Sequence, residues 1–83
     1  MYRGVTEVRA IDDYRLILKF DNNEYRLFDL KPYLGLGRFA ELRDINVFKQ
    51  IGISFDTVAW KNGLDLDPEF LYAHSQAVSA PEE

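Results

Sequence analysis

The chain has 83 residues, enough for one domain and too few for two. Its composition, 47% hydrophobic and 29% charged, is typical of a globular protein and not of a disordered one. The lack of cysteine excludes a disulfide scaffold and thiolate chemistry. The net charge of −4 argues against a dedicated nucleic-acid binder, which usually carries a basic surplus.

No segment looks like a membrane helix or a targeting sequence. The longest apolar runs fall well short of the roughly 18–20 residues that span a bilayer. The N-terminal residues enter strand-like sequence directly, without the features of a signal peptide. We therefore expect a cytoplasmic protein that does not associate with membranes.

The first part of the chain predicts three antiparallel strands. Residues 5–11 are rich in β-branched side chains, and residues 14–20 alternate between two faces. After a turn, residues 24–29 return as the third strand. These strands form the expected centre of the fold.

The Asn-Asn pair at 22–23 tolerates positive φ angles and so predicts a two-residue hairpin turn. That turn would place Lys19 opposite Arg26 on one face and Leu16 opposite Asp29 on the apolar face. A carboxylate at position 29 would then approach the core.

The second part predicts shorter elements. In chain order these are a helical turn at 30–34, a short element at 39–42, a helix at 44–50 capped by Asp44, and strands at 51–56 and 57–61. Asn62-Gly63 is a strong hairpin signal and would put Trp60 opposite Asp65. A last helix starts with Asp67 as its cap and runs to about Gln76.

Together these elements predict an α+β fold, in which hairpins form a curled antiparallel β-sheet with short helices and one C-terminal helix. Residues 1–76 form the expected single domain. Residues 77–83 are small and polar and end in two glutamates, which predicts a flexible acidic tail.

Four stretches resemble one small bacterial family. They are Leu-Lys-Phe-Asp-Asn-Asn-Glu at 18–24, Phe-Asp-Leu at 28–30, Phe-Ala-Glu-Leu at 39–42, and the block from Trp60 through Asn-Gly and Asp-Pro to Tyr72. The family is known as domain of unknown function 2442. The resemblance covers roughly residues 5–74 and implies a small α+β cytoplasmic protein without an established activity or defined catalytic residues.

The resemblance also implies a genetic setting. Many members are encoded beside a second short protein, in the manner of a toxin–antitoxin pair with this family on the antitoxin-like side. Some members carry a helix-turn-helix domain after this one. We expect no such domain within the 83 residues, so a DNA-binding role that depends on it does not carry over.

Catalytic and metal-binding patterns are weak. His74 is the one histidine, but its neighbour Ser75 lies outside any nucleophile-elbow motif. Asp29 has two interpretations, as a cap for the turn at 30–34, which we favour, or as a buried general base. The acidic residues at 65–69 resemble a calcium loop but lack its later glycine and glutamate. We expect no enzyme activity, metal or cofactor.

Two groups of residues suggest binding. Arg15, Lys19 and Arg26 are expected to share one sheet face, where they could hold phosphate or RNA. The second group surrounds the last hairpin and helix, and consists of Trp60, Asn62, Asp65 and Tyr72. Trp60 is either an interface anchor or a core residue whose indole N–H binds Asp65.

The residues therefore favour a non-catalytic protein-interaction module. Its partner would be a small protein or a second copy, docked on an exposed strand edge, and the antitoxin-like role is one form of this hypothesis. The alternative is binding of nucleic acid or a small ligand through the basic sheet face, although the net charge makes nucleic acid the weaker choice. An enzyme that uses Asp29 or His74 ranks last.

Overall fold

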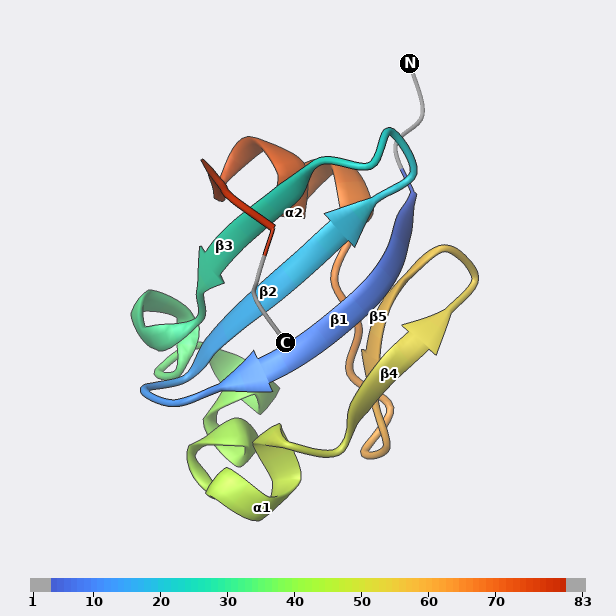
Figure 1. The fold of residues 1–83 in the computed structure, drawn as a ribbon. Helices are drawn as coiled ribbons and strands as arrows, with labels where there is room; N and C mark the ends of the chain where they lie inside the picture. Colours follow the sequence, from blue (N-terminus) through green and yellow to red (C-terminus); the bar gives the residue numbers. More distant parts are fainter. Residues whose placement is uncertain (1–3, 81–83) are drawn as a thin grey trace.

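The computed structural model describes residues 4–80 and has an α+β fold, as predicted (Figure 1). Its elements are β1 (Val5–Ile11), β2 (Arg15–Phe20), β3 (Tyr25–Asp29), the 3₁₀ helices η1 (Lys31–Tyr33) and η2 (Gly37–Arg43), α1 (Ile45–Phe48), β4 (Ile51–Ser54), β5 (Thr57–Trp60), α2 (Pro68–Ala73) and β6 (Gln76–Val78). Within this part of the chain, none of the helices is long and apolar enough to cross a bilayer.

The strands form two antiparallel sheets. One has four strands in the order β1-β2-β3-β6, and the other is the β4–β5 hairpin. The hairpin lies beside β1 in Figure 1 and is joined to it by a hydrogen bond of 2.8 Å from the Val5 N–H to the Asp56 carbonyl. Helix α2 packs behind β3, so one face of the larger sheet is covered and the other is open (Figure 1).

The C-terminal segment differs from the prediction. Helix α2 ends at Ala73 instead of Gln76, and the chain then forms β6 against β3. Ala77 and Val78, which were assigned to the flexible tail, are therefore part of the sheet. The pairing satisfies main-chain groups on β3 that would otherwise form an open edge, which outweighs local helix propensity. The two glutamates at the end of the predicted tail lie outside the described residues.

The register of the β2–β3 hairpin is also shifted by one residue. Lys19 lies opposite Tyr25, and Leu18 lies opposite Arg26. The cause is a loop of three residues instead of two, closed by a 2.9 Å bond from the Phe20 N–H to the Glu24 carbonyl. A one-residue shift moves side chains to the other face of a strand, so the predicted Lys19–Arg26 pair is wrong.

The same difference recurs at the last hairpin. The Trp60 N–H binds the Leu64 carbonyl at 2.8 Å, and Ala59 lies opposite Asp65. The predicted pairing of Trp60 with Asp65 is therefore wrong by one residue. In both loops the positive φ angle falls on the last residue, 68° for Asn23 and 94° for Gly63.

The predicted helix caps are correct. The side chain of Asp44 accepts a hydrogen bond from the Asn46 N–H, and that of Asp67 accepts one from the Glu69 N–H, at 3.0 and 2.9 Å. These bonds satisfy N–H groups that a helix start leaves without an internal partner. The caps fix where α1 and α2 begin.

The core lies between the larger sheet and the elements behind it. Each fully buried Leu or Phe side chain contributes roughly 1.5–3 kcal/mol relative to an exposed one. Strand β2 supplies Leu16, Leu18 and Phe20 at alternate positions, and the remaining buried hydrophobic residues are Val5, Phe28, Leu30, Leu42, Phe48, Val58, Trp60 and Leu71. The β4–β5 hairpin thus contributes Val58 and Trp60 of β5 to the core, and the partly buried Ile51 of β4 packs against this core.

Candidate protein-interaction surface

The β4–β5 hairpin turns at Phe55-Asp56, inside the segment predicted as a strand. Both residues have left-handed backbones, with φ angles of 52° and 67°. Two successive positive φ angles define a type I′ turn, which matches the twist of the flanking strands but favours Asn and Gly. A phenylalanine in this conformation is a steric outlier. The sequence gives little signal for this turn, because Asp56 is common in turns but Phe55 is not.

Phe55 is the most exposed large hydrophobic residue among residues 4–80, with 96% of its surface accessible. Its neighbour Ile53 is 42% exposed. Phe55 therefore combines an unfavourable backbone with a ring that contributes almost nothing to the core. Such an outlier points to a role outside the fold itself.

Strand β4 lies close to β1 but forms no ladder with it. Within the described part of the chain it pairs with β5 alone. The Lys61 N–H binds the Gln50 carbonyl at 3.1 Å, so Gln50 and Lys61 are a hydrogen-bonded pair of the ladder. Because antiparallel hydrogen bonds alternate along a strand, the N–H and C=O groups of Ile51 and Ile53 point away from β5. These groups can bind an added strand.

A groove of about 580 Å³ lies on the hairpin, lined by residues 49–54 on the β4 side and 59–61 on the β5 side. We call it the β4 groove. An ideal Cβ placed on Gly52 would meet nothing within 4 Å, so the groove is open above this residue. Lys49 and Lys61 line it as well, and neither makes an ion pair with another residue of the 4–80 segment. The groove thus combines free main-chain groups, hydrophobic side chains and two available ammonium groups.

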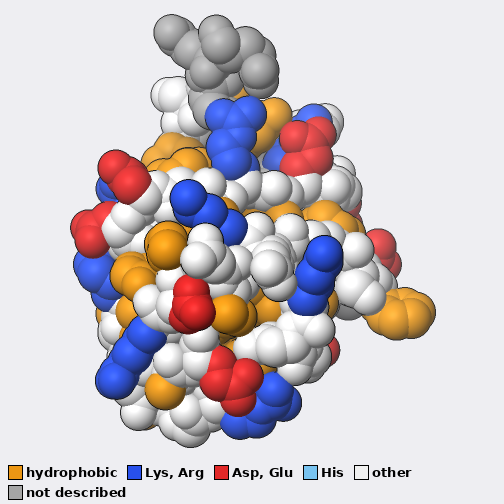
Figure 2. Space-filling view, turned by 90° about the horizontal axis from the view of Figure 1, so that it is seen from below, with side chains coloured by type: hydrophobic (Ala, Val, Ile, Leu, Met, Phe, Trp, Pro, Cys, Tyr) orange, Lys and Arg blue, Asp and Glu red, His pale blue; other side chains and the backbone are white. Residues whose placement is uncertain are grey.

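The three predicted basic residues do not share one face of the sheet. Arg15 and Lys19 lie on the open face of the larger sheet, whereas Arg26 lies on the opposite face because of the register shift. Arg15 is paired with Asp12 at 2.9 Å, and Lys19 lies 3.6 Å from Glu7. Figure 2 shows a face of the molecule where acidic and basic side chains are interspersed among hydrophobic ones.

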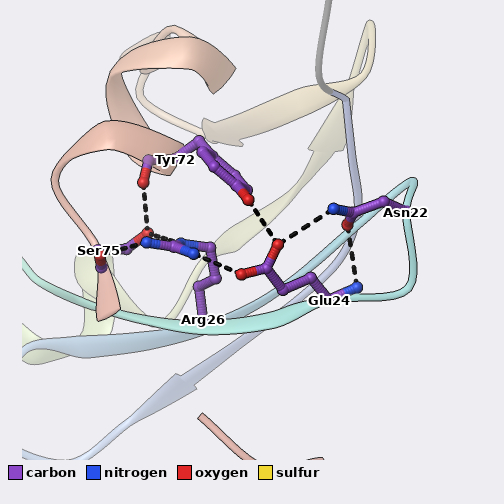
Figure 3. A network of polar contacts seen from close by, with 5 residues as sticks. All are labelled: Asn22, Glu24, Arg26, Tyr72 and Ser75. Atoms are coloured by element: carbon purple, nitrogen blue, oxygen red, sulfur yellow. Dashed lines mark hydrogen bonds and ion pairs between the residues drawn. The ribbon is translucent and has the colours of Figure 1, made fainter. Parts of the chain in front are cut away.

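Arg26 instead joins β3 to the end of α2 (Figure 3). It donates to the Ser75 Oγ at 2.8 Å and to the Ser75 carbonyl at 2.7 Å, and it pairs with Glu24 at 2.5 Å. Its guanidinium lies over the Tyr72 ring, 4.2 Å from the centroid. Partly buried networks of this kind stabilise packing between elements, so Arg26 is engaged within the fold.

Glu24 is the acceptor of this network. The Tyr72 hydroxyl donates to its carboxylate at 2.6 Å, and Asn22 donates at 3.1 Å (Figure 3). Hydrogen bonds to the charged form, first from Tyr72 and then from Asn22, lower the pKa of Glu24. Tyr72 therefore braces α2 against the sheet and is not a free surface anchor.

The other members of the second predicted group are separated. Trp60 is 3% exposed, and its indole N–H donates to the Phe48 carbonyl at 2.9 Å instead of to Asp65. Its place in the core rules out the interface-anchor interpretation. Asn62 binds Glu41 at 3.0 Å, and Asp65 is exposed. These residues do not form one site, although Trp60 supports the floor of the β4 groove.

Asp29 is exposed and not buried, again because of the shifted register. It accepts a hydrogen bond from the Lys31 N–H at 3.0 Å and pairs with the Lys31 ammonium at 3.1 Å, so it does cap the following turn. Asp29 and His74 line one hollow of about 380 Å³. Lys31 also lies there, and its hydrogen bond with Asp13, followed by that with Asp29, raises the pKa of its ammonium.

Comparison with known proteins gives a family and a fold. The family model described as "Protein of unknown function (DUF2442)" matches residues 5–77. No curated protein matches the chain. One solved structure, "Putative DNA Binding Protein NE0471" of Nitrosomonas europaea, is similar with a TM-score of 0.77 and 22% identity over 89% of this chain. The match covers 49% of that protein, so this chain spans about half its length.

Proposed function

The chain belongs to the DUF2442 family, and from this premise we propose that it is a non-catalytic protein-interaction module that binds its partner through the β4–β5 hairpin. The observation that carries the proposal is Phe55, an aromatic residue held outward at a positive φ angle. Exposed aromatic side chains are frequent interface anchors because they bury a large area at low entropic cost.

The β4 groove supports the same proposal. An added strand would satisfy the main-chain groups of Ile51 and Ile53, and the side chain of Ile53 would lose water. Lys49 and Lys61 favour a partner segment that carries carboxylates. Main-chain bonds would give affinity and the side chains would give selectivity.

The test is co-purification of a partner with matched variants. We expect the tagged chain to retain one protein in near-equal amounts from an extract of its host. Phe55→Ser should lose that protein. Leu36→Ser should keep it, because Leu36 is also a large exposed residue, at 57%, but lies outside the hairpin. Equal retention by all three chains would refute the proposal.

The antitoxin-like role is the finer form of this proposal, and with it we propose a cytoplasmic location. Its support is the genetic setting implied by the family resemblance. Co-expression tests it. The product of the neighbouring gene should arrest growth alone, and this chain should relieve the arrest only with Phe55 intact. Relief of the arrest by Phe55→Ser would show that the antitoxin-like role does not depend on the hairpin.

DNA binding is a second candidate, favoured by the name of the similar Nitrosomonas europaea protein. In this chain it would use Arg15 and Lys19 on the open sheet face. It predicts binding that weakens as salt rises and that is lost when both residues become glutamate. Lys49→Glu is the matched charge control. Equal binding by wild type and the double variant would exclude this face.

A further inference from the structure

We propose that the β4 edge is self-complementary, so that β4 of one copy pairs antiparallel with β4 of a second copy across a two-fold axis. This deepens the proposed function, on which it rests, by naming one occupant of the same surface. The product would be a continuous four-stranded sheet in the order β5-β4-β4-β5.

The hydrogen-bonding phase of β4 fits this pairing. Ile51 and Ile53 both direct their N–H and C=O groups outward and are separated by Gly52. A two-fold axis at Gly52 sets Ile51 opposite Ile53 of the second copy. Each such pair exchanges two bonds, which gives about four main-chain hydrogen bonds across the axis.

Gly52 has no evident role within a single copy. An ideal Cβ on it would meet nothing within 4 Å, and its φ angle lies outside the left-handed range. Glycine within a strand weakens the strand, and it often marks a place where another backbone approaches closely. On the proposed axis, the two Gly52 residues face each other as the close, non-hydrogen-bonded pair.

Charges at the two ends of β4 are complementary. Lys49 precedes the strand and Asp56 follows it, both exposed. Neither has an ion-pair partner among residues 4–80. Antiparallel pairing sets the Lys49 ammonium of one copy beside Phe55 and Asp56 of the other, where it can bind the ring face and the carboxylate. The contact occurs twice because of the symmetry.

Hydrophobic burial adds to the pairing. Phe55 and Ile53 are 96% and 42% exposed in the single copy, and both lie along the paired edge. Their side chains would pack on the second copy's hairpin. The interface is small, so we expect a dimer with a dissociation constant on the order of micromolar and not a permanent assembly.

Sedimentation equilibrium of the full chain tests the inference. Samples from about 1 µM to about 1 mM span the expected constant. Wild type should shift from monomer to dimer. Lys49→Glu and Asp56→Lys should each raise the dissociation constant at least about tenfold, because each places like charges together. Combining the two should restore dimerisation, since the opposite charges are paired again.

The control is Asp65→Lys, the same exchange on the far side of β5, which should leave the dissociation constant unchanged. A monomer at every concentration would overturn self-pairing, while Phe55-dependent capture of a different protein would leave the proposed function standing. Self-pairing would also be overturned if neither single charge variant changed the dissociation constant, or if the double variant failed to restore dimerisation. Either result would show that another surface is used.

Discussion

Replacing Phe55 by asparagine should stabilise the fold and weaken association. An L-residue in the left-handed region costs roughly 1–2 kcal/mol, and asparagine tolerates this conformation far better than phenylalanine does. The loss of ring burial is small. Full burial of a Phe side chain is worth about 1.5–3 kcal/mol. With Phe55 96% exposed, the lost share is about 0.1 kcal/mol. We expect a net gain of about 1 kcal/mol.

Chemical and thermal denaturation measure this gain. In a domain of this size, about 1 kcal/mol raises Tm by roughly 4–8 °C. Leu36→Asn is the matched control, because Leu36 is 57% exposed but has an ordinary φ angle of −103°. Its stability should not rise, and the same burial arithmetic gives a loss of about 0.6–1.3 kcal/mol, because more of the Leu36 side chain is buried. Measurements below the dimer dissociation constant keep folding separate from association.

The result that refutes the reasoning is a Phe55→Asn chain that is no more stable than wild type. It would mean that the ring makes stabilising contacts in the monomer, so the strain would need no functional explanation. A gain in stability together with unchanged association would preserve the strain argument and remove the functional one.

Three further predictions concern the core and the network. Trp60→Phe should cost about 2 kcal/mol, because the buried Phe48 carbonyl loses its donor, and an unchanged urea midpoint would contradict this. Arg26→Ala should cost about 2 kcal/mol by removing the bonds to Ser75, whereas an effect below about 0.5 kcal/mol would make the network incidental. The lowered pKa of Glu24 predicts stability that is present above pH 4.5 and lost as the pH falls below it. Glu24→Gln should therefore flatten the acid limb of a stability-against-pH curve, and an identical limb would show that other carboxyls control it.

The elements with local chemical signals could be predicted from the sequence. Asp44 and Asp67 cap their helices because a short carboxylate before a helix start has few better partners than the free N–H groups. The alternation of Leu16, Leu18 and Phe20 located the buried face of β2 correctly. The family resemblance agreed with these features over nearly the whole fold.

The register was predicted wrongly, because an asparagine side chain can accept a main-chain hydrogen bond and so favour a longer loop. Asn22 and Asn62 each accept a hydrogen bond from the N–H two residues later, at 3.0 and 3.2 Å. This Asx turn favours a three-residue loop, with the positive φ angle on the following residue. The resulting shift moved Arg26 into the network with Tyr72 and moved Asp29 out to solvent.

The candidate surface itself had no sequence signal. Phe55 follows a hydrophobic stretch and would normally be assigned to a buried strand position. Its exposure follows from the hairpin turning at Phe55-Asp56, a register that places Val58 and Trp60 of β5 in the core. Tertiary packing therefore determined a turn that local propensity opposes.

Amide hydrogen exchange at Ile53, resolved by NMR, tests the account most directly. Its N–H points away from β5, whereas the Gly52 N–H is bonded within the hairpin and serves as an internal reference. The account predicts fast exchange at Ile53 in dilute protein and strong slowing on association, with Gly52 protected throughout. If the Ile53 amide stays fast in the associated protein, then the partner does not add a strand to β4, and the central claim is contradicted.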